Sequence, residues 1–94
     1  MLARDFARAL EAADQAISLA PGELWIYPNR AHALMFLDRL KEARQQYLKY
    51  RYETDVQAGK SWQTVVLEDF AALRKAGLAH PLMDEIEQEF SSVR

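Results

Sequence analysis

The chain has 94 residues, of which 50% are hydrophobic and 28% are charged, and its formal net charge is −2. A chain of this length can build one domain around a modest core. Nucleic-acid-binding proteins usually carry a basic patch, so the negative balance, with both signs interspersed, argues against that class. The sequence contains no cysteine, which excludes disulfides and thiolate chemistry and leaves a cytoplasmic location as the default expectation.

The N-terminal sequence does not predict a signal peptide, because Arg4, Asp5 and Arg8 interrupt its apolar residues. No run approaches the roughly 18 apolar residues that span a bilayer, so no membrane segment is expected. Good helix formers dominate the composition, and there are only three glycines and three prolines. The composition therefore predicts an all-α domain.

The first two predicted helices lie on either side of Pro21. The first covers residues 3–19, because proline disfavours helical geometry in the residue before it. The second covers residues 24–37, with Pro28 close to its first turn, where a missing N–H costs least. Asp38 then occupies the turn, since aspartate tolerates such geometry better than most residues.

Three further helices follow in the C-terminal half. The third covers residues 40–52, and a polar loop leads to Ser61, a plausible N-cap for the fourth. Gly77 suits the left-handed position that ends the fourth helix, and Pro81 opens the fifth. Apolar residues recur at spacings of three and four throughout, which predicts five helices in an antiparallel stack without strands.

The apolar pattern of the first helix recurs in the third, thirty-four residues later. Phe6, Ala9, Ala13 and Ala16 correspond to Leu40, Ala43, Tyr47 and Tyr50. A fixed period of 34 residues is typical of helix-turn-helix repeat proteins. At about 100° per residue, Tyr47 and Tyr50 should be mostly buried and Tyr52 should lie nearer the surface.

The second and third helices resemble a tetratricopeptide repeat (TPR). The matching positions are Tyr27, Ala31 and Leu34 in the second helix and Ala43, Tyr47 and Tyr50 in the third. The first helix resembles the second half of a preceding repeat, through Ala9, Ala13, Ala16 and Pro21. Arg30 stands where the repeat usually has an apolar residue. Because buried tyrosine hydroxyls usually have a hydrogen-bond partner, Arg30 is a candidate for that role.

The resemblance covers residues 5–53 of a single domain, 1–94, in which residues 61–93 would be a C-terminal capping helix pair. The strings NRAHALMFL and LEDFAALRKAGLAHPLMDEIE also resemble the C-terminal ends of longer bacterial TPR proteins. The resemblance implies a non-enzymatic protein–protein interaction module that binds a peptide or a partner protein, in a chain that begins within a repeat. The alternatives are a structural or regulatory end-cap of a larger protein, and a small-ligand-binding or enzymatic domain that uses His32.

In TPR arrays the first helix of each pair lines a concave groove. The resemblance therefore implies partner-binding roles for Trp25, Asn29, His32 and Phe36. Under this hypothesis a His32→Ala change weakens partner binding with almost no effect on the melting temperature. The alternative is that Trp25 and Phe36 pack against the fourth helix, with Met35, while His32 is merely exposed. A clamp for a terminal carboxylate is not expected, because only Asn29 matches its basic and polar positions.

The first helix has a wider apolar surface than one neighbouring helix pair can cover. One flank of this surface consists of Leu2, Ala9, Ala12, Ala16 and Leu19. We expect this flank to be covered by something outside the chain. The candidates are upstream helices of a longer chain, a partner protein, or a second copy in a homo-oligomer. By contrast, the apolar stripe of the fifth helix is narrow, and Glu85, Glu87 and Glu89 are interpreted as a solvated face.

The sequence shows no motif for catalysis, a cofactor or a metal. A glycine-rich phosphate loop, a Gly-x-Ser-x-Gly elbow and a Ser/His/Asp set are all missing. His32 and His80 lie on different predicted helices without a cysteine or an HxxxH spacing, which is a weak basis for zinc. We therefore expect neither a metal nor a cofactor.

Overall fold

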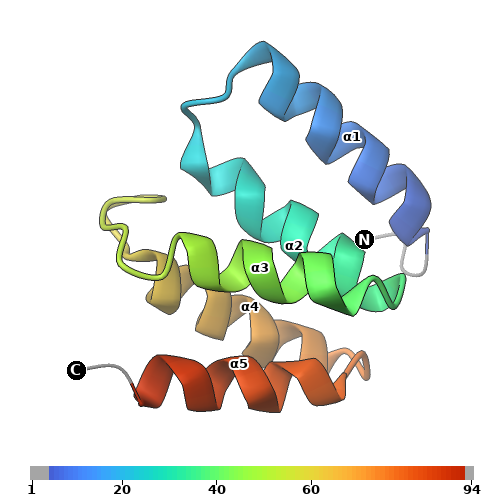
Figure 1. Cartoon of the computed structure of the whole chain (residues 1–94), viewed down its shortest axis with the longest axis vertical. Helices are drawn as coiled ribbons and strands as arrows, with labels where there is room; N and C mark the ends of the chain where they lie inside the picture. Colours follow the sequence, from blue (N-terminus) through green and yellow to red (C-terminus); the bar gives the residue numbers. More distant parts are fainter. Residues whose placement is uncertain (1–4, 93–94) are drawn as a thin grey trace.

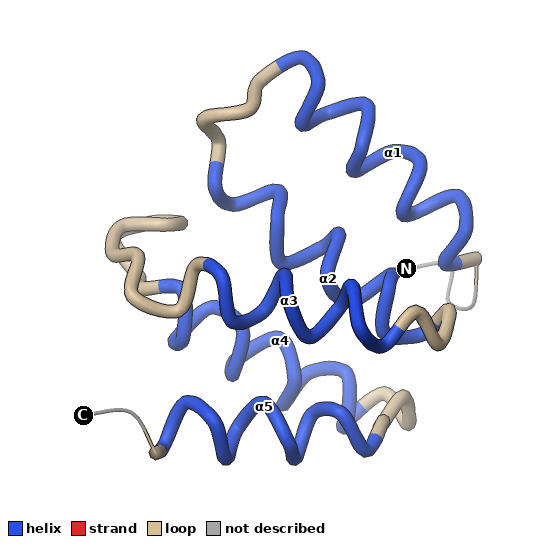
Figure 2. The backbone as a smooth tube through the Cα atoms, in the orientation of Figure 1, coloured by secondary structure: helices blue, strands red, loops and turns tan. Residues whose placement is uncertain are grey.

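The domain consists of five α-helices connected by turns and loops (Figure 1). The computed structural model describes residues 5–92. The helices are α1 (Phe6–Leu19), α2 (Tyr27–Phe36), α3 (Leu40–Lys49), α4 (Trp62–Lys75) and α5 (Pro81–Ser91). A single 3₁₀ turn, Leu24–Ile26, precedes α2. The described residues contain no strand, only an isolated bridge between Gln57 and Lys60 (Figure 2), so the prediction of an all-α, five-helix domain is confirmed.

The chain reverses direction between successive helices, and α2 lies in the middle of the molecule (Figure 1). It packs against α1 and α3, whereas α5 packs against α3 and α4. The largest fully buried side chains come from α2, α3, α4 and α5: Leu34, Met35, Tyr47, Trp62, Phe70 and Ile86. Most of the core therefore lies among these four helices, and α1 contributes Leu10 to it.

Several helix ends have the capping features that the sequence predicts. The hydroxyl of Ser61 accepts a hydrogen bond from the amide of Thr64 at 3.2 Å, which confirms the N-cap. Gly77 has φ 84°, and the amide of Leu78 donates to the carbonyl of Leu73 at 2.8 Å, as in a Schellman motif. Asp38 takes the equivalent position after α2 with φ 60°.

Helix α3 ends at Lys49, three residues before the predicted boundary at residue 52. The reason is a tertiary hydrogen bond: the indole N–H of Trp62 donates to the carbonyl of Tyr47 at 2.8 Å. That carbonyl would otherwise accept from the amide of Arg51, which instead bonds to the carbonyl of Leu48 at 3.4 Å. The last turn therefore tightens and the helix stops.

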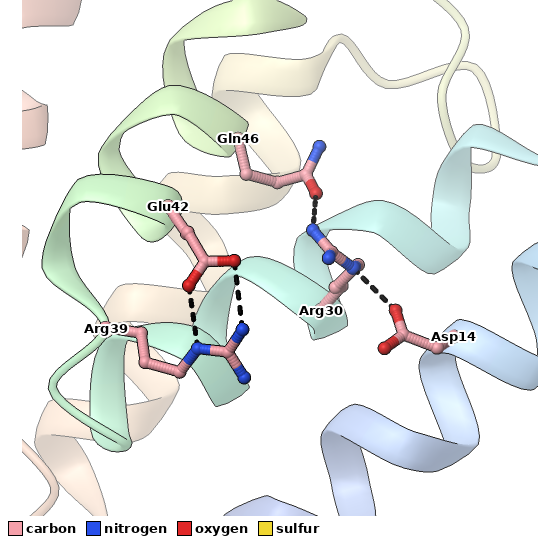
Figure 3. Close-up of polar contacts among 5 residues, drawn as sticks. All are labelled: Asp14, Arg30, Arg39, Glu42 and Gln46. Carbon is pink, nitrogen blue, oxygen red and sulfur yellow. Dashed lines mark hydrogen bonds and ion pairs between the residues drawn. The ribbon is translucent and has the colours of Figure 1, made fainter.

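Arg30 is not the partner of a buried tyrosine, so this prediction is wrong. Its guanidinium lies between α1 and α3, where Nε donates to Asp14 and Nη1 donates to Gln46, both at 2.6 Å (Figure 3). The hydroxyl of Tyr47 lies instead 2.6 Å from Nδ1 of His32. Arg30 thus joins three helices, α1, α2 and α3, at a partly exposed edge.

The burial of the tyrosines follows the predicted order. Tyr47 is fully buried, Tyr50 is partly buried, and Tyr52 is 66% exposed. Helix α5 buries the described residues of its predicted apolar stripe, Leu82, Met83, Ile86 and Phe90. Val93, the last residue of that stripe, lies outside the described residues.

Two of the three glutamates of the interpreted solvated face are partly exposed and also pair with other helices. Glu85 accepts a bidentate pair of hydrogen bonds from Arg44 of α3, and Glu87 accepts from Arg74 of α4 at 2.6 and 3.0 Å. Glu89 is exposed. The ion pairs hold α5 against its two neighbours, a role that spacing along one helix cannot reveal.

Candidate functional site

A pocket of about 520 Å³ opens between α1, α2 and α4, and we refer to it as the α1–α2–α4 pocket. Its floor is formed by α2 and the preceding turn: Trp25, Ile26, Asn29, His32, Ala33 and Phe36. The structure thus brings together all four residues for which the resemblance implies a role in partner binding. Trp25 is 46% exposed and Asn29 is exposed, whereas Phe36 is partly buried.

The wall from α1 is built mainly from alanines: Ala9, Ala12, Ala13 and Ala16. Their small side chains leave the space that a larger residue would fill. Phe6 also lines the pocket, and its ring stacks on that of Phe36 with centroids 4.6 Å apart. The wall therefore consists of apolar surface without hydrogen-bonding side chains.

The predicted association flank of the first helix divides into two parts. Ala9, Ala12 and Ala16 line the α1–α2–α4 pocket. Leu19 is 87% exposed and lies outside the lining, whereas Leu2 lies outside the described residues. The flank and the groove residues are separate hypotheses from the sequence, and in the fold three residues of the flank and all four groove residues line one pocket.

His32 is held by hydrogen bonds from two other helices. Its Nδ1 lies 2.6 Å from the hydroxyl of Tyr47 on α3, and its Nε2 lies 2.9 Å from Oδ2 of Asp69 on α4. The side chain is only 12% exposed, so His32 is neither merely exposed nor a free groove residue. The hydrogen bonds are satisfied when Nε2–H donates to Asp69 and the hydroxyl of Tyr47 donates to Nδ1, which is the tautomer we assign.

The Tyr47 hydroxyl keeps its proton at neutral pH. Burial raises the pKa of Tyr47 well above its ordinary value of 10.0, and the negative charge of Asp69 raises it further. The group therefore acts as a hydrogen-bond donor beneath the pocket. None of the described residues that line the pocket is Ser, Thr, Cys or Lys.

Trp25 lies where the floor of the pocket meets the solvent, at its rim, and a carboxylate orients its indole. The indole N–H donates to Oε1 of Glu23 at 3.0 Å. Nearby on α2, Asn29 lines the same pocket with an exposed amide, a group with both a donor and an acceptor. An aromatic ring and an amide are thus presented next to the alanine wall.

The sequence did not identify the wall from α4, which comprises Asp69, Ala72 and Leu73. Asp69 and Ala72 are three residues apart, so they share one side of a helix. They flank the apolar stripe that includes Phe70. The sequence pattern of these residues is equally compatible with a solvated edge of the helix. It indicates a pocket wall only when the position of α2 beside α4 is known.

The two histidines contact different carboxylates: His32 contacts Asp69, and Nε2 of His80 lies 3.4 Å from Asp38. Among residues 5–92, no group of three or more His, Cys, Asp or Glu side chains is placed to hold a metal ion. No helix in this part of the chain is long and apolar enough to cross a membrane. Comparisons with protein-family models, with curated proteins and with solved structures found no match.

Proposed function

We propose that the domain is a non-enzymatic protein–protein interaction module of the TPR type, which holds a peptide segment of a partner in the α1–α2–α4 pocket. One observation carries the proposal. The residues of α2 to which the resemblance gives a groove role line the same open, mostly apolar pocket as the alanines of α1. An apolar pocket with a few polar groups is the usual form of a binding site.

The environments of residues thirty-four positions apart support the TPR part of the proposal. Ala13 and Tyr47 are both buried, as expected for equivalent positions of a repeat. Ala9 is exposed whereas Ala43 is fully buried. Helix α3 has α5 as a further neighbour besides α2. Helix α1 thus leaves uncovered a surface that its counterpart buries.

The polar groups of the pocket favour a peptide as the occupant. The exposed amide of Asn29 can accept from one backbone N–H and donate to one backbone carbonyl. Trp25 offers an exposed ring of the type that often anchors protein interfaces. The alanine wall can accommodate apolar side chains that extend from the same peptide.

The test is a selection of binders from a random-peptide display library, followed by affinity measurements on matched variants. Ala72 and Ala71 are neighbouring exposed residues of α4, but only Ala72 lines the pocket. We expect Ala72→Phe to fill the pocket and weaken the selected peptides at least about tenfold, a loss of about 1.4 kcal/mol. Ala71→Phe should leave the affinity unchanged. Equal affinity for both variants, or a selection without binders, contradicts the proposal.

The size of the pocket favours a second candidate, a small apolar ligand. Its volume of about 520 Å³ falls within the range of roughly 300–1,000 Å³ that is typical of small-molecule sites. A ligand that binds only the folded state raises the melting temperature. A fragment screen in which hits stabilise Ala71→Phe but not Ala72→Phe would favour this candidate.

A further inference from the structure

We infer that the α1–α2–α4 pocket selects partner segments in which an apolar side chain is accompanied by a positively charged one. The inference rests on the proposed function and adds the chemical class of the partner. The observation behind it is the placement of Asp69 in an otherwise apolar lining.

Asp69 lines the pocket, and one of its two carboxylate oxygens has no partner among the described residues. Its Oδ2 accepts from Nε2 of His32 at 2.9 Å, whereas its Oδ1 has no partner within residues 5–92. The side chain is 38% exposed, so an occupant can reach it. In the assigned tautomer, Nε2–H of His32 donates to this carboxylate. His32 therefore fixes the position of the carboxylate.

The aromatic rim reinforces the preference for a cation. The ring of Trp25 is 46% exposed, and its N–H is turned toward the carboxylate of Glu23. A cation over the ring gains from the negative face of the indole and from Glu23 beside it. No Lys or Arg belongs to the described lining. Three basic residues lie in α4 or directly before it. Lys60 and Arg74 donate to carboxylates outside the lining, and Lys75, at the end of the helix, is exposed and also lies outside the lining.

The alternative occupants are disfavoured for physical reasons. An acidic or phosphorylated segment would bring like charge against Asp69. A purely apolar segment would cover the carboxylate and leave its free oxygen without a hydrogen bond, which costs free energy. A basic side chain next to an apolar one satisfies both parts of the lining, with the apolar group against Ala12 and Ala16.

The experiment compares peptides selected from the same display library on the wild-type protein and on Asp69→Asn. The asparagine oxygen can still accept from His32, so the variant keeps the internal hydrogen bond, and a melting curve checks the fold. We expect lysine or arginine to be enriched in peptides selected on the wild type and the enrichment to disappear on Asp69→Asn. Replacement of the basic residue in the best peptide by methionine should weaken its binding to the wild type about two- to fivefold. The same replacement should leave its binding to Asp69→Asn unchanged.

The outcomes separate this inference from the proposed function. Two outcomes would overturn the inference and leave the proposed function in place. In the first, the selected peptides lose affinity for Ala72→Phe but carry no basic residue. In the second, the preference for basic residues is the same on Asp69→Asn as on the wild type. A selection without pocket binders overturns both. Sedimentation of the protein without peptide measures its oligomeric state. If the protein forms a dimer that Ala12→Phe dissociates, a second copy of the chain occupies the pocket and the inference is overturned.

Discussion

Nε2 of His32 lies 2.9 Å from Oδ2 of Asp69, so a residue on the floor of the pocket is joined directly to one in its wall. The other ring nitrogen of His32 lies 2.6 Å from the hydroxyl of Tyr47, which is buried in the core. One side chain therefore connects α2, α3 and α4. The position of the pocket wall depends on this polar contact as well as on apolar packing.

The first prediction concerns His32→Ala, which should lower the free energy of unfolding by about 1–3 kcal/mol. The buried hydroxyl of Tyr47 would lose its acceptor, and only the weakly accepting sulfur of Met35, 3.9 Å away, would remain near it. This prediction replaces the expectation from the sequence that His32→Ala has almost no effect on the melting temperature. Urea denaturation measures the effect, with the exposed Asn29→Ala as a control that should stay within about 0.5 kcal/mol of the wild type. An equal effect of the two changes would contradict the proposed network.

The second prediction concerns alkaline pH and Tyr47→Phe. Burial raises the pKa of Tyr47 above its ordinary value of 10.0, so folding favours the neutral phenol. This contribution to stability is fully present below the ordinary value and is lost as the pH rises through the higher value of the folded protein. Above about pH 10, the stability of the wild type should therefore fall more steeply with pH than that of Tyr47→Phe. Parallel curves in urea denaturation would show that another group dominates.

The third prediction concerns acid and the contact between α3 and α5. Hydrogen bonds from the guanidinium of Arg44 lower the pKa of Glu85 below its ordinary value of 4.5. The carboxylate therefore adds stability above that value, and the contribution is lost as the pH falls through the lower pKa of the folded state. The difference in stability between the wild type and Glu85→Gln should be present at neutral pH and vanish in acid. Glu89→Gln, at an exposed position of the same helix, should show no such convergence.

The fourth prediction compares two glycines with open space around the position of an added Cβ. Gly77 has φ 84° after α4, so Gly77→Ala should be destabilising by about 1 kcal/mol. Gly22 has no such positive φ, and Gly22→Ala should be neutral or stabilising by up to about 1 kcal/mol, because it restricts the unfolded chain. Thermal denaturation of both variants measures the contrast. Effects of the same sign would show that φ does not decide the outcome.

The fold could be predicted from local sequence signals because helices and their ends depend on nearby residues. The apolar spacing places the helices, and Ser61 and Gly77 mark two of their ends. The errors arise where distant residues intervene. Trp62 ends α3 through the carbonyl of Tyr47, and Arg30 finds its partners on two other helices.

Half of the candidate site could be predicted in the same way. The resemblance points to Trp25 and Asn29, and the helical period points to the alanine flank that includes Ala12. Neither signal shows that the two surfaces face each other. Asp69 could not be identified, because its importance depends on the placement of α4 beside His32, which no local pattern encodes.

The central claim is that the α1–α2–α4 pocket holds a partner peptide. The most direct measurement is the change in backbone amide chemical shifts when the isotope-labelled protein binds its tightest selected peptide. We expect the largest changes around the pocket, near Ala12, Asn29 and Ala72, with little change along the outer surface of α5. We also expect these changes to be lost in Ala72→Phe. Changes that centre on α5, or that persist in Ala72→Phe, would contradict the proposal.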